Sequence, residues 1–422
     1  MSENLSIQEY ANLLAENARE ASQFVRALSA DTRNQVLFRV AKLLRERLHE
    51  ILAANAVDVE AAEGNLSPSM VDRLTLNPAR IEAMAKGVEE IAAFTDPLNR
   101  VLEKRTLKNG LDISRVSVPI GTIFFIYESR PNVTIDGAAL CFKSGNAVIL
   151  RGGKESLASS KYLTTLFREA LQIGGVHEDA VQLVRTPDRE LMRLLLQKNE
   201  EIDLVIPRGG EGLIRAVVEQ SRIPVIKHFN GICHIYVDKS AKFSEVGAIL
   251  ENAKVQRPSV CNTMETLLID RAIDDNVIRD FLSPLVKKEV QFFGDAEVCS
   301  RIENVHEIED MSHYRIEYLD LKLSIRFVGG VEEACAHIEK YSSRHTEAIL
   351  AEDTTVQNYF IQHVDSSSVM INASTRFADG GEYGLGAEVG ISTDKLHARG
   401  PMGMESLCTY QWIVRGNGQI RE

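Results

Sequence analysis

The feature that most constrains the fold is an alternation of short apolar runs with amphipathic runs that begins near residue 115. Apolar runs end in paired glycines at 146–153 and 202–210, and a stretch of helical periodicity follows each of them. A strand followed by a helix of about ten residues or more forms a βαβ unit, in which the strands are parallel. The chain is therefore predicted to be an α/β protein with parallel sheets, and residues 223–229 are predicted as one further strand.

The alternation starts again at residues 233–238, which indicates a second α/β unit. A single hydrophobic core rarely serves 422 residues, so two or three domains are expected. Helical periodicity separates the apolar runs of this second stretch. The further strands predicted in it lie at 264–270, 323–329, 347–353 and 367–373.

Both ends of the chain depart from this alternation. The first hundred residues show helical periodicity, as in Leu13, Leu14, Ala18 and Ala21, which share one helical face. The tail at 407–416 reads as a strand with no partner nearby in the sequence. A lone terminal strand often completes another sheet, in its own chain or in another subunit.

Composition argues against several classes of protein. The formal net charge is −12 without blocks of Lys or Arg, which argues against a nucleic-acid partner, because binding phosphates needs clustered cations. No window reaches the ~18 apolar residues of a membrane span, and residues 1–14 do not resemble a signal peptide. The six cysteines form no C-x-x-C pair, so neither a disulfide framework nor a metal site is expected. A reducing cytoplasm fits these observations best.

One cysteine stands apart from the other five. Cys261 lies in RPSVCNTMET, among small polar residues between a predicted helix and a predicted strand. A free cysteine is usually buried, which is one interpretation. A loop between two elements is also where an exposed thiolate of low pKa can be held, so these residues leave both interpretations open. The apolar patterns around four other cysteines predict burial of Cys141, Cys233, Cys335 and Cys408.

Two glycine turns follow predicted strands and could contact a nucleotide. Residues 205–218 read as strand, turn and helix, and backbone N–H groups at such a helix start can hold a pyrophosphate. The spacing is not G-x-G-x-x-G, so an ordinary turn is favoured on the pattern alone. Residues 147–156 place Arg151 and Lys154 around two glycines. That turn is either simply solvated or a cationic contact to a nucleotide ribose or its 2′-phosphate.

Two further segments carry weaker signals. Residues 127–134 end a strand and place Arg130 and Asn132 on either side of a proline, where an Asn amide can stabilise an oxyanion. Residues 393–406 bring His397 and Arg399 near two glycines, as either an anion-binding loop or a basic surface turn.

Several of these segments occur in an order that resembles the γ-glutamyl phosphate reductases, a family in the aldehyde dehydrogenase superfamily. The resemblance covers nearly the whole chain, and its later motifs are more specific than any glycine turn. The segments that carry it are YESRPNVT, GNAVILRGGKES, PRGGEGLI, VCNTMETLL, INASTRFADGG, EYGLGAEVGISTDKLHARGPMG and TYQWIVRG.

The resemblance implies an aldehyde dehydrogenase-like α/β fold with two Rossmann-like domains and a small β element for oligomerisation. The cofactor-binding domain is expected at 1–100 and 119–230, and the catalytic domain at 231–394. Oligomerisation strands are expected at 101–118 and 405–422, so the chain is expected to form a homo-oligomer.

The resemblance also implies roles for particular residues. Cys261 matches the nucleophile, and Asn132 matches the amide of the oxyanion hole, although the stretch before Asn132 is two residues out of step. Glu317 is expected to hold the nicotinamide ribose, on a poor alignment. The other expected cofactor contacts are Arg151, Lys154, Ser156, Pro207, Arg208, Gly209 and Gly210, and the expected anion ligands of the substrate are Arg130, Arg376, His397 and Arg399.

The activity implied by the resemblance is the reduction of L-glutamyl 5-phosphate by NADPH to L-glutamate 5-semialdehyde and phosphate, through a thioester on Cys261. This is the second step of proline biosynthesis, and the upstream glutamate kinase is a candidate partner. The choice of NADPH over NADH does not follow from Arg151 and Lys154 alone. No metal is expected.

One departure from the wider superfamily bears on the acyl partner. Hydrolytic aldehyde dehydrogenases carry a Glu before a paired-glycine turn, and this Glu activates water against the thioester. The segment KHFNG places His228 at that position, which favours phosphate over water. The alternatives are a hydrolytic aldehyde dehydrogenase and a non-catalytic nucleotide-binding protein on the same fold.

Overall fold

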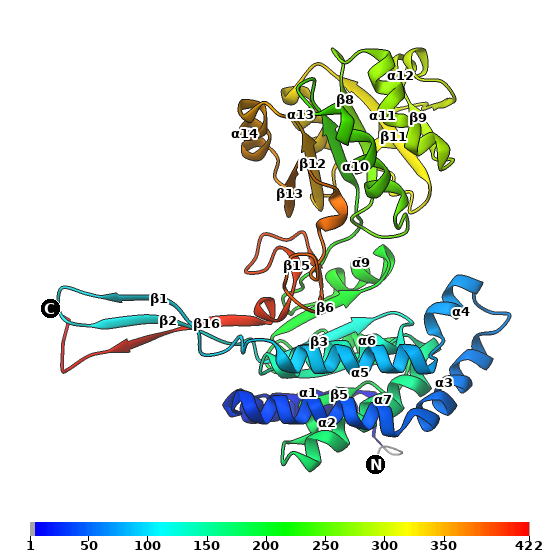
Figure 1. Cartoon of the computed structure of the whole chain (residues 1–422). Coiled ribbons are helices and arrows are strands. Elements are labelled where there is room, and N and C mark those ends of the chain that lie inside the picture. The colour runs from blue at the N-terminus through cyan, green and yellow to red at the C-terminus, as the bar shows by residue number, and fades with distance from the viewer. Residues whose placement is uncertain (1–4, 422) are drawn as a thin grey trace. The chain divides into compact units, whose positions relative to one another are not determined.

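The computed structural model describes residues 5–421, which form two compact units (Figure 1). Unit 1 comprises the residues up to 227, residues 385–390 and the residues from 402 on, whereas unit 2 comprises 228–384 and 391–401. Residues 385–390 differ from the expected boundaries, which grouped them with the second domain. They pack in unit 1 so closely that a Cβ on Gly386 would lie 2.1 Å from the Phe94 ring.

The N-terminal part of unit 1 is helical, as predicted. Ser6 begins the first helix with a capping box, in which its hydroxyl accepts from the Glu9 N–H while the Glu9 carboxylate accepts from Ser6. Apolar stripes on these helices, including Val36 and Val40, are buried. The helices are α1 (Ile7–Ala27), α2 (Ala30–Glu46), α3 (Leu48–Ala62), α4 (Pro68–Leu74) and α5 (Pro78–Ala93).

A four-stranded parallel sheet forms the centre of unit 1, in the order β5-β4-β3-β6. Its strands are β3 (Thr122–Tyr127), β4 (Ala147–Arg151), β5 (Val181–Leu183) and β6 (Leu204–Arg208). The helices that follow them in the chain are α6 (Pro131–Lys143), α7 (Leu157–Ile173), α8 (Arg189–Leu195) and α9 (Glu211–Gln220).

The strand predicted at 223–229 is wrong. Only one isolated bridge, between Val225 and Val205, forms in this segment. Pro224 has no N–H to donate to a sheet, and the chain passes into unit 2 after Lys227.

Unit 2 is built on a seven-stranded parallel sheet in the order β10-β9-β11-β8-β7-β12-β13. The five predicted strands of this stretch are present, whereas β9, β10 and α12 were not predicted because they are too short to show a period. The strands are β7 (Cys233–Val237), β8 (Met264–Asp270), β9 (Gln291–Gly294), β10 (Val305–Glu307), β11 (Lys322–Val328), β12 (Thr346–Leu350) and β13 (Ser368–Ile371). The helices are α10 (Phe243–Val255), α11 (Asp275–Lys287), α12 (Ala296–Arg301), α13 (Val331–Tyr341) and α14 (Thr354–His363).

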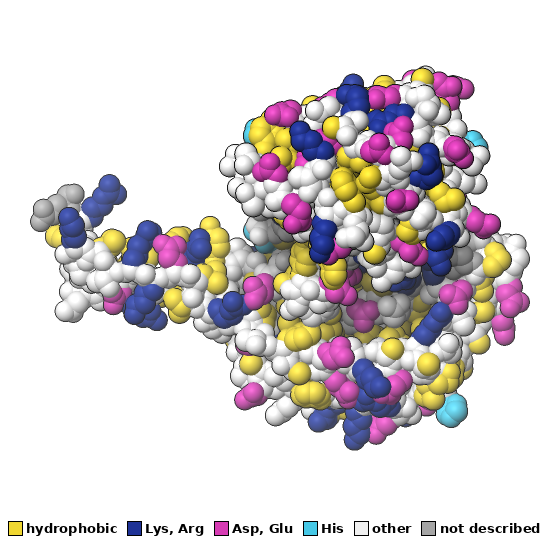
Figure 2. All heavy atoms as spheres, turned by 45° about the horizontal axis from the view of Figure 1, so that its top comes forward, with side chains coloured by type: hydrophobic (Ala, Val, Ile, Leu, Met, Phe, Trp, Pro, Cys, Tyr) yellow, Lys and Arg dark blue, Asp and Glu magenta, His cyan; other side chains and the backbone are white. Residues whose placement is uncertain are grey.

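A separate antiparallel sheet extends from unit 1 (Figure 1). It contains β1 (Val101–Thr106), β2 (Asp112–Pro119) and the terminal strand β16 (Cys408–Arg415), which pairs with β2 along its whole length. The tail strand therefore does complete a distant sheet, and it does so in its own chain. Basic and apolar side chains share the surface of this sheet (Figure 2), and the Arg115 guanidinium lies 4.9 Å from the centre of the Tyr410 ring.

Two short strands, β14 (Gly390–Ser392) and β15 (Gly400–Met402), form a further pair near the C-terminus. Within residues 5–421, no helix combines the length and apolar character that crossing a membrane requires.

Candidate functional site

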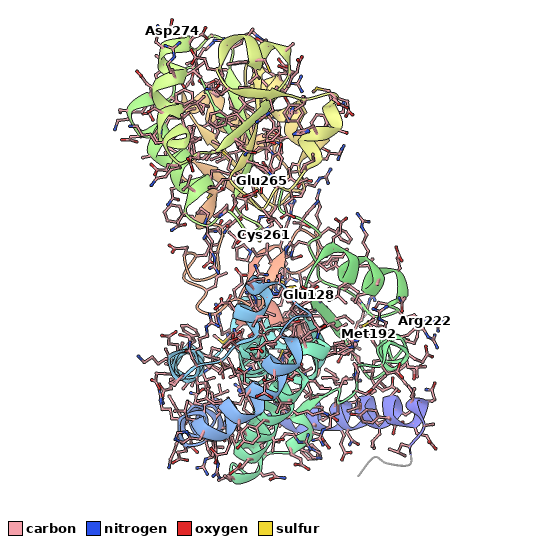
Figure 3. The ribbon with its side chains drawn as sticks, turned by 90° about the vertical axis from the view of Figure 1, so that its right-hand side faces the viewer. Glu128, Met192, Arg222, Cys261, Glu265 and Asp274 are labelled. Atoms are coloured by element: carbon pink, nitrogen blue, oxygen red, sulfur yellow. The ribbon has the colours of Figure 1, made fainter. Side chains whose placement is uncertain are left out.

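Cys261 lies in the loop that joins α10 to β8, a short distance before Glu265 on that strand (Figure 3). The buried Thr263 holds this loop, because its N–H donates to the Val260 carbonyl at 3.1 Å and its hydroxyl donates to the Arg257 carbonyl at 2.8 Å. Cys261 itself is partly exposed. The loop therefore offers a reachable thiol on a constrained backbone.

The four cysteines predicted to be buried are buried. Burial raises the pKa of Cys335 and of Cys408 to about 12, and it also raises the pKa of Cys141. A thiol with so high a pKa stays protonated at neutral pH and is a poor nucleophile. Cys299 is the other partly exposed cysteine, and burial also raises its pKa.

The backbone of Cys261 is held by Cys233, the first residue of β7, and by Gly231 just before that strand. The Cys233 thiol donates to the Cys261 carbonyl at an Sγ–O distance of 3.2 Å. Gly231 packs against the same carbonyl so tightly that a Cβ there would lie 1.8 Å from its oxygen. The Gly231 N–H donates to Glu317 Oε1 at 2.8 Å. Position 231 therefore admits only glycine unless the Cys261 loop moves.

Two histidine rings extend these contacts, since His345 lies against the Cys233 thiol and His228 lies against His345. The His345 Nδ1 lies 3.8 Å from the Cys233 Sγ, and the His345 ring meets the His228 ring edge to face at a centroid distance of 5.8 Å. Burial, and then the charge of His228, lowers the pKa of His345 to about 3, so His345 is neutral at physiological pH. His228 Nδ1 lies 3.0 Å from the Ile391 carbonyl. Because a carbonyl only accepts, this contact requires the proton of His228 to be on Nδ1.

Arg376, one of the expected substrate ligands, is tied to the residue that follows Cys261. Its Nη1 donates to Asn262 Oδ1, and its Nε donates to Gln256 Oε1 at 3.0 Å. The buried Asn262 amide in turn donates to the Ala378 carbonyl at 3.0 Å. The guanidinium is thus positioned by groups on both sides of the Cys261 loop.

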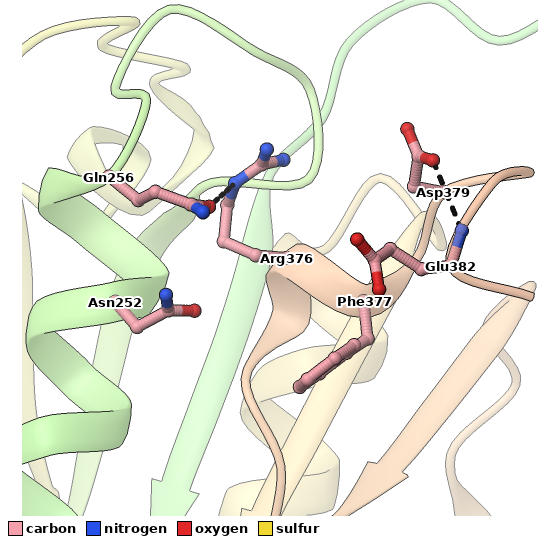
Figure 4. A pocket seen from close by; sticks show the side chains of 6 residues that line it. All are labelled: Asn252, Gln256, Arg376, Phe377, Asp379 and Glu382. Atoms are coloured by element: carbon pink, nitrogen blue, oxygen red, sulfur yellow. Dashed lines mark hydrogen bonds between the residues drawn. The ribbon is translucent and has the colours of Figure 1, made fainter.

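Arg376 also lines a pocket in unit 2 (Figure 4). Burial lowers the pKa of Arg376, and the charge of Arg257 lowers it further. The opposing interactions come from groups that can carry negative charge, namely Asp379, Cys261 and Glu382. The pocket is lined by Asn252, Gln256, Arg376, Phe377, Asp379 and Glu382.

The other expected substrate ligands form contacts that differ from those of Arg376. Arg399 forms an ion pair with Asp365 at 2.9 Å, and Lys395 pairs with the same carboxylate. Arg344 pairs with this carboxylate as well, so Asp365 is shared by three cationic side chains. His397 lies on the loop between Lys395 and Arg399.

Arg130 and Asn132 lie at the start of α6 in unit 1, where Arg130 is the N-cap. The Asn132 amide nitrogen donates to Asp136 Oδ2 at 3.0 Å, one helical turn later. Burial raises the pKa of Asp136 to about 6, against the lowering effect of this hydrogen bond. The amide of Asn132 is therefore oriented by its own helix.

Of the expected cofactor contacts, three lie at the end of β4 or just after it. Arg151 ends that strand, and Lys154 and Ser156 form the short 3₁₀ helix η1 (Lys154–Ser156). Burial, and then the charge of Arg189, lowers the pKa of Arg151. The Arg151 Nε is buried and has no hydrogen-bond partner in the described part of the chain. Two guanidinium groups thus lie near each other at the carboxyl edge of the unit 1 sheet, where α/β proteins bind ligands.

The turn after β6 contains the other expected contacts. Pro207 and Arg208 end the strand, and Gly209 and Gly210 precede α9. The Gly210 N–H, which sequence reasoning offered to a pyrophosphate, donates to Glu128 Oε1 at 2.9 Å. A carboxylate thus occupies this donor in the structure.

Sequence reasoning missed several of these groups. Cys233 was predicted only to be buried and Gly231 was not singled out, so the contacts of both residues with the Cys261 carbonyl were not foreseen. Glu128 follows β3 and Arg189 begins α8, and their contacts depend on which strands become neighbours, so no local pattern marks them. Asp379 and Glu382 lie in the segment FADGGEY. The available signal for them was the pair of glycines between the two acidic residues, which is typical of a turn.

Comparison with known proteins agrees with this arrangement. A model of the aldehyde dehydrogenase family matches residues 5–291. The gamma-glutamyl phosphate reductase of Paramagnetospirillum magneticum is 47% identical over 409 residues, which cover 97% of this chain and 96% of that protein. That of Thermobifida fusca is also 47% identical, over 98% of this chain and 99% of the relative.

Solved structures give the same result. The crystal structure of gamma-glutamyl phosphate reductase from Thermotoga maritima matches with a TM-score of 0.96 and 40% identity, over 98% of this chain and 100% of that one. An acetylating aldehyde dehydrogenase from Geobacillus thermoglucosidasius, at 15% identity and a TM-score of 0.68 over 99% of this chain and 98% of that one, shares the fold. The chain therefore belongs to the aldehyde dehydrogenase family and, within it, to the gamma-glutamyl phosphate reductases.

Proposed function

We propose that the protein reduces L-glutamyl 5-phosphate to L-glutamate 5-semialdehyde and phosphate with NADPH, in the biosynthesis of proline from glutamate. The observation that carries this proposal is Cys261, a partly exposed thiol on a loop held by the Cys233 thiol and by Gly231. Its setting contrasts with the buried, high-pKa thiols elsewhere in the chain, such as Cys335. A reducing compartment such as the cytoplasm suits this chain, because its six cysteines, all among the described residues, form no disulfide bonds.

In the proposed reaction the Cys261 thiolate attacks C5 of the acyl phosphate, and phosphate leaves with the electron pair of the C5–O bond. This covalent step gives a thioester held on the enzyme. NADPH, when bound, would supply the hydride that reduces the thioester. The Asn132 amide is proposed to stabilise the oxyanion in both steps, and collapse of the tetrahedral adduct releases the aldehyde and regenerates the Cys261 thiolate.

We propose that His228, which stands where hydrolytic enzymes carry a Glu, does not activate water against the thioester. Its Nδ1–H is occupied by the Ile391 carbonyl, and its ring adjoins the buried, neutral His345. An imidazole in this setting lacks the carboxylate charge with which a Glu would draw a proton from water. The thioester can then persist until phosphate attacks it in the reverse direction.

The test of the proposed function is the oxidation of L-glutamate 5-semialdehyde with NADP, with and without phosphate or arsenate. Sustained formation of NADPH should require one of these anions, because without them the acyl group stays on Cys261 after a single turnover. The assay follows absorbance of the reduced nicotinamide and identifies the product by mass spectrometry. Steady turnover to free glutamate in plain buffer would instead identify a hydrolytic aldehyde dehydrogenase.

We propose NADPH as the cofactor because of the two guanidinium groups after β4 and β5. Among residues 5–421, neither the partly buried Arg151 nor the exposed Arg189 has a carboxylate partner, and the charge of Arg189 opposes that of Arg151. A phosphate with two negative charges would relieve this repulsion, and arginine suits phosphate because its donors form a fork. With Lys154 on the adjoining η1, these residues would hold the 2′-phosphate of NADPH.

Replacement of Arg189 should therefore change the choice of cofactor. Arg189→Gln is expected to raise the KM for NADPH about tenfold, the effect of losing one charge-assisted contact, and to leave the KM for NADH nearly unchanged. The matched control is Arg193→Gln on the same helix, because Arg193 is already paired with Glu190 at 2.6 Å. An equal rise in both KM values would contradict a 2′-phosphate contact.

The three-stranded sheet of β1, β2 and β16 is the proposed surface for assembly of a homo-oligomer. It exposes large apolar side chains on strands that are far apart in the sequence. An open sheet edge and exposed aromatic groups are features that a second copy can cover. The exposed residues are Val101, Leu102, Tyr410, Trp412 and Val414.

A further inference from the structure

The pocket lined by Arg376 carries charges of both signs, and Arg376 connects it to Asn262, the residue next to Cys261. Arg376 provides the positive charge, and Asp379 and Glu382 provide the negative charges (Figure 4). Arg376 is fixed by Gln256 and by Asn262, the residue next to Cys261. The pocket and the nucleophile therefore belong to one structural unit.

Among the described residues, Arg376 forms no hydrogen bond or ion pair with either acidic side chain of the pocket. Asp379 Oδ1 accepts from the Gly381 N–H at 2.9 Å and from the Glu382 N–H at 3.4 Å, which shapes the turn and leaves Oδ2 without a hydrogen-bond partner among the described residues. Glu382 is exposed on the same turn. Arg376 donates to two neutral amide groups rather than to a carboxylate, so one cation and two anions remain available to a ligand.

The proposed substrate has the complementary charges. One end of L-glutamyl 5-phosphate carries an α-carboxylate and an α-ammonium on the same carbon, and the other end carries the acyl phosphate. A ligand whose acyl carbon reaches Cys261 therefore brings a negative and a positive group into the neighbourhood of Arg376, Asp379 and Glu382. Charge-assisted hydrogen bonds to both groups would orient the whole molecule.

We propose, on the basis of the proposed function, that Arg376 binds the α-carboxylate and that Asp379, assisted by Glu382, binds the α-ammonium of the substrate. Arg376 was expected to be an anion ligand, whereas a binding site for the ammonium group is new. The pocket thereby selects α-amino acids over the corresponding simple acids.

This contact also protects the acyl group from the substrate's own amine. A free α-amine can attack C5 of the Cys261 thioester: an N–C5 bond forms, the C5–Sγ bond breaks, its electron pair returns to sulfur, and nitrogen loses a proton to water. The product is the five-membered lactam 5-oxopyrrolidine-2-carboxylate. An ammonium held by carboxylates has no lone pair for this attack, because a nearby negative charge favours its protonated form.

The test compares two aldehydes that differ only in the amino group, L-glutamate 5-semialdehyde and 5-oxopentanoate, in phosphate-dependent oxidation with NADP. The variant Asp379→Asn keeps an oxygen to accept from the turn and removes the charge. Glu382→Gln removes the charge at the second position. Glu339→Gln is the control, since Glu339 is an exposed carboxylate of unit 2 that pairs with Arg344.

Asp379→Asn is expected to lower kcat/KM for the semialdehyde by about 10- to 100-fold and for 5-oxopentanoate by less than about threefold, the range for losing a hydrogen bond to a charged group. Glu382→Gln should act in the same direction with a smaller effect. An equal loss on both aldehydes would show that Asp379 only supports the turn, and it would overturn the proposal.

A second measurement follows the acyl enzyme without phosphate. With the semialdehyde, the thioester of Asp379→Asn should be lost faster than that of the wild type, with release of the lactam. With 5-oxopentanoate, which has no amine, the two proteins should retain the acyl group equally, as judged by intact-protein mass. Equal lifetimes of both semialdehyde thioesters would contradict protection of the amine.

These outcomes differ from failure of the proposed function itself. If Cys261 does not form a thioester, neither aldehyde will give an acyl enzyme in the wild type. If the thioester forms and only the recognition of the amino group is wrong, both aldehydes will acylate wild type and variants with unchanged relative rates.

Discussion

Cys261→Ser is expected to lower kcat for the phosphate-dependent oxidation of L-glutamate 5-semialdehyde by about 10⁴-fold or more, as is typical when a covalent nucleophile is removed. A serine hydroxyl at the same place remains protonated at neutral pH and is a much weaker nucleophile than a thiolate. The loop should keep its structure, because the contacts of Cys233, Gly231 and Thr263 are made with backbone atoms.

The measurement is a spectrophotometric assay joined to a titration of NADPH binding by fluorescence, which should be unchanged. Cys299→Ser is the matched control, because Cys299 is also partly exposed and lies in unit 2. Thiol labelling gives an independent reading, since Cys261 should react much faster than the other cysteines. Retention of activity in the Cys261 variant would refute the thioester mechanism.

Asn132→Ala is expected to lower kcat by about 10²- to 10³-fold with a much smaller change in KM, the usual cost of removing one donor from an oxyanion hole. The reason is that negative charge develops on the acyl oxygen only as the thiolate or hydride adds, so the amide acts mainly in the transition state. Asn132→Asp should be at least as damaging, because it replaces the donor with an anion.

The hydrogen bond from Asn132 to Asp136 makes a control possible. Asp136→Asn retains a group that accepts from Asn132, so it should preserve most of the activity if Asp136 only orients the amide. Thermal unfolding of each variant checks that α6 remains folded. A proportional rise in KM with unchanged kcat in Asn132→Ala would contradict a role in the transition state.

Much of the architecture followed from periodicity alone. The strands of both units, such as β4 and β8, are short apolar runs bounded by turns, and burial on both faces of a parallel sheet requires that pattern. The helices of the first hundred residues were recognisable for the same reason, since their apolar stripes face a core. Prediction failed where local pattern and pairing disagree: the apolar run at 223–229 contains Pro224 and forms only one bridge.

The candidate site was predictable in part. Cys261 was identifiable because its polar loop contrasts with the apolar surroundings of the other cysteines, and Arg376 because the family motif includes it. The groups that hold them were not identifiable, because Cys233 and Asn262 act through contacts of backbone and side chain between distant segments. The Gly210 N–H shows the opposite case, in which a plausible ligand donor proves to be occupied by Glu128.

The sequence by itself determined most of the strands and helices, the family and the candidate nucleophile, because these depend on residue type and spacing along the chain. Only the tertiary structure decided which charges meet. It brings Arg151 near Arg189, places Asp365 against Arg399, and sets Asp379 in the pocket of Arg376. Such pairs depend on distances across a packed core, and those distances are set by how whole strands and helices pack rather than by any local pattern.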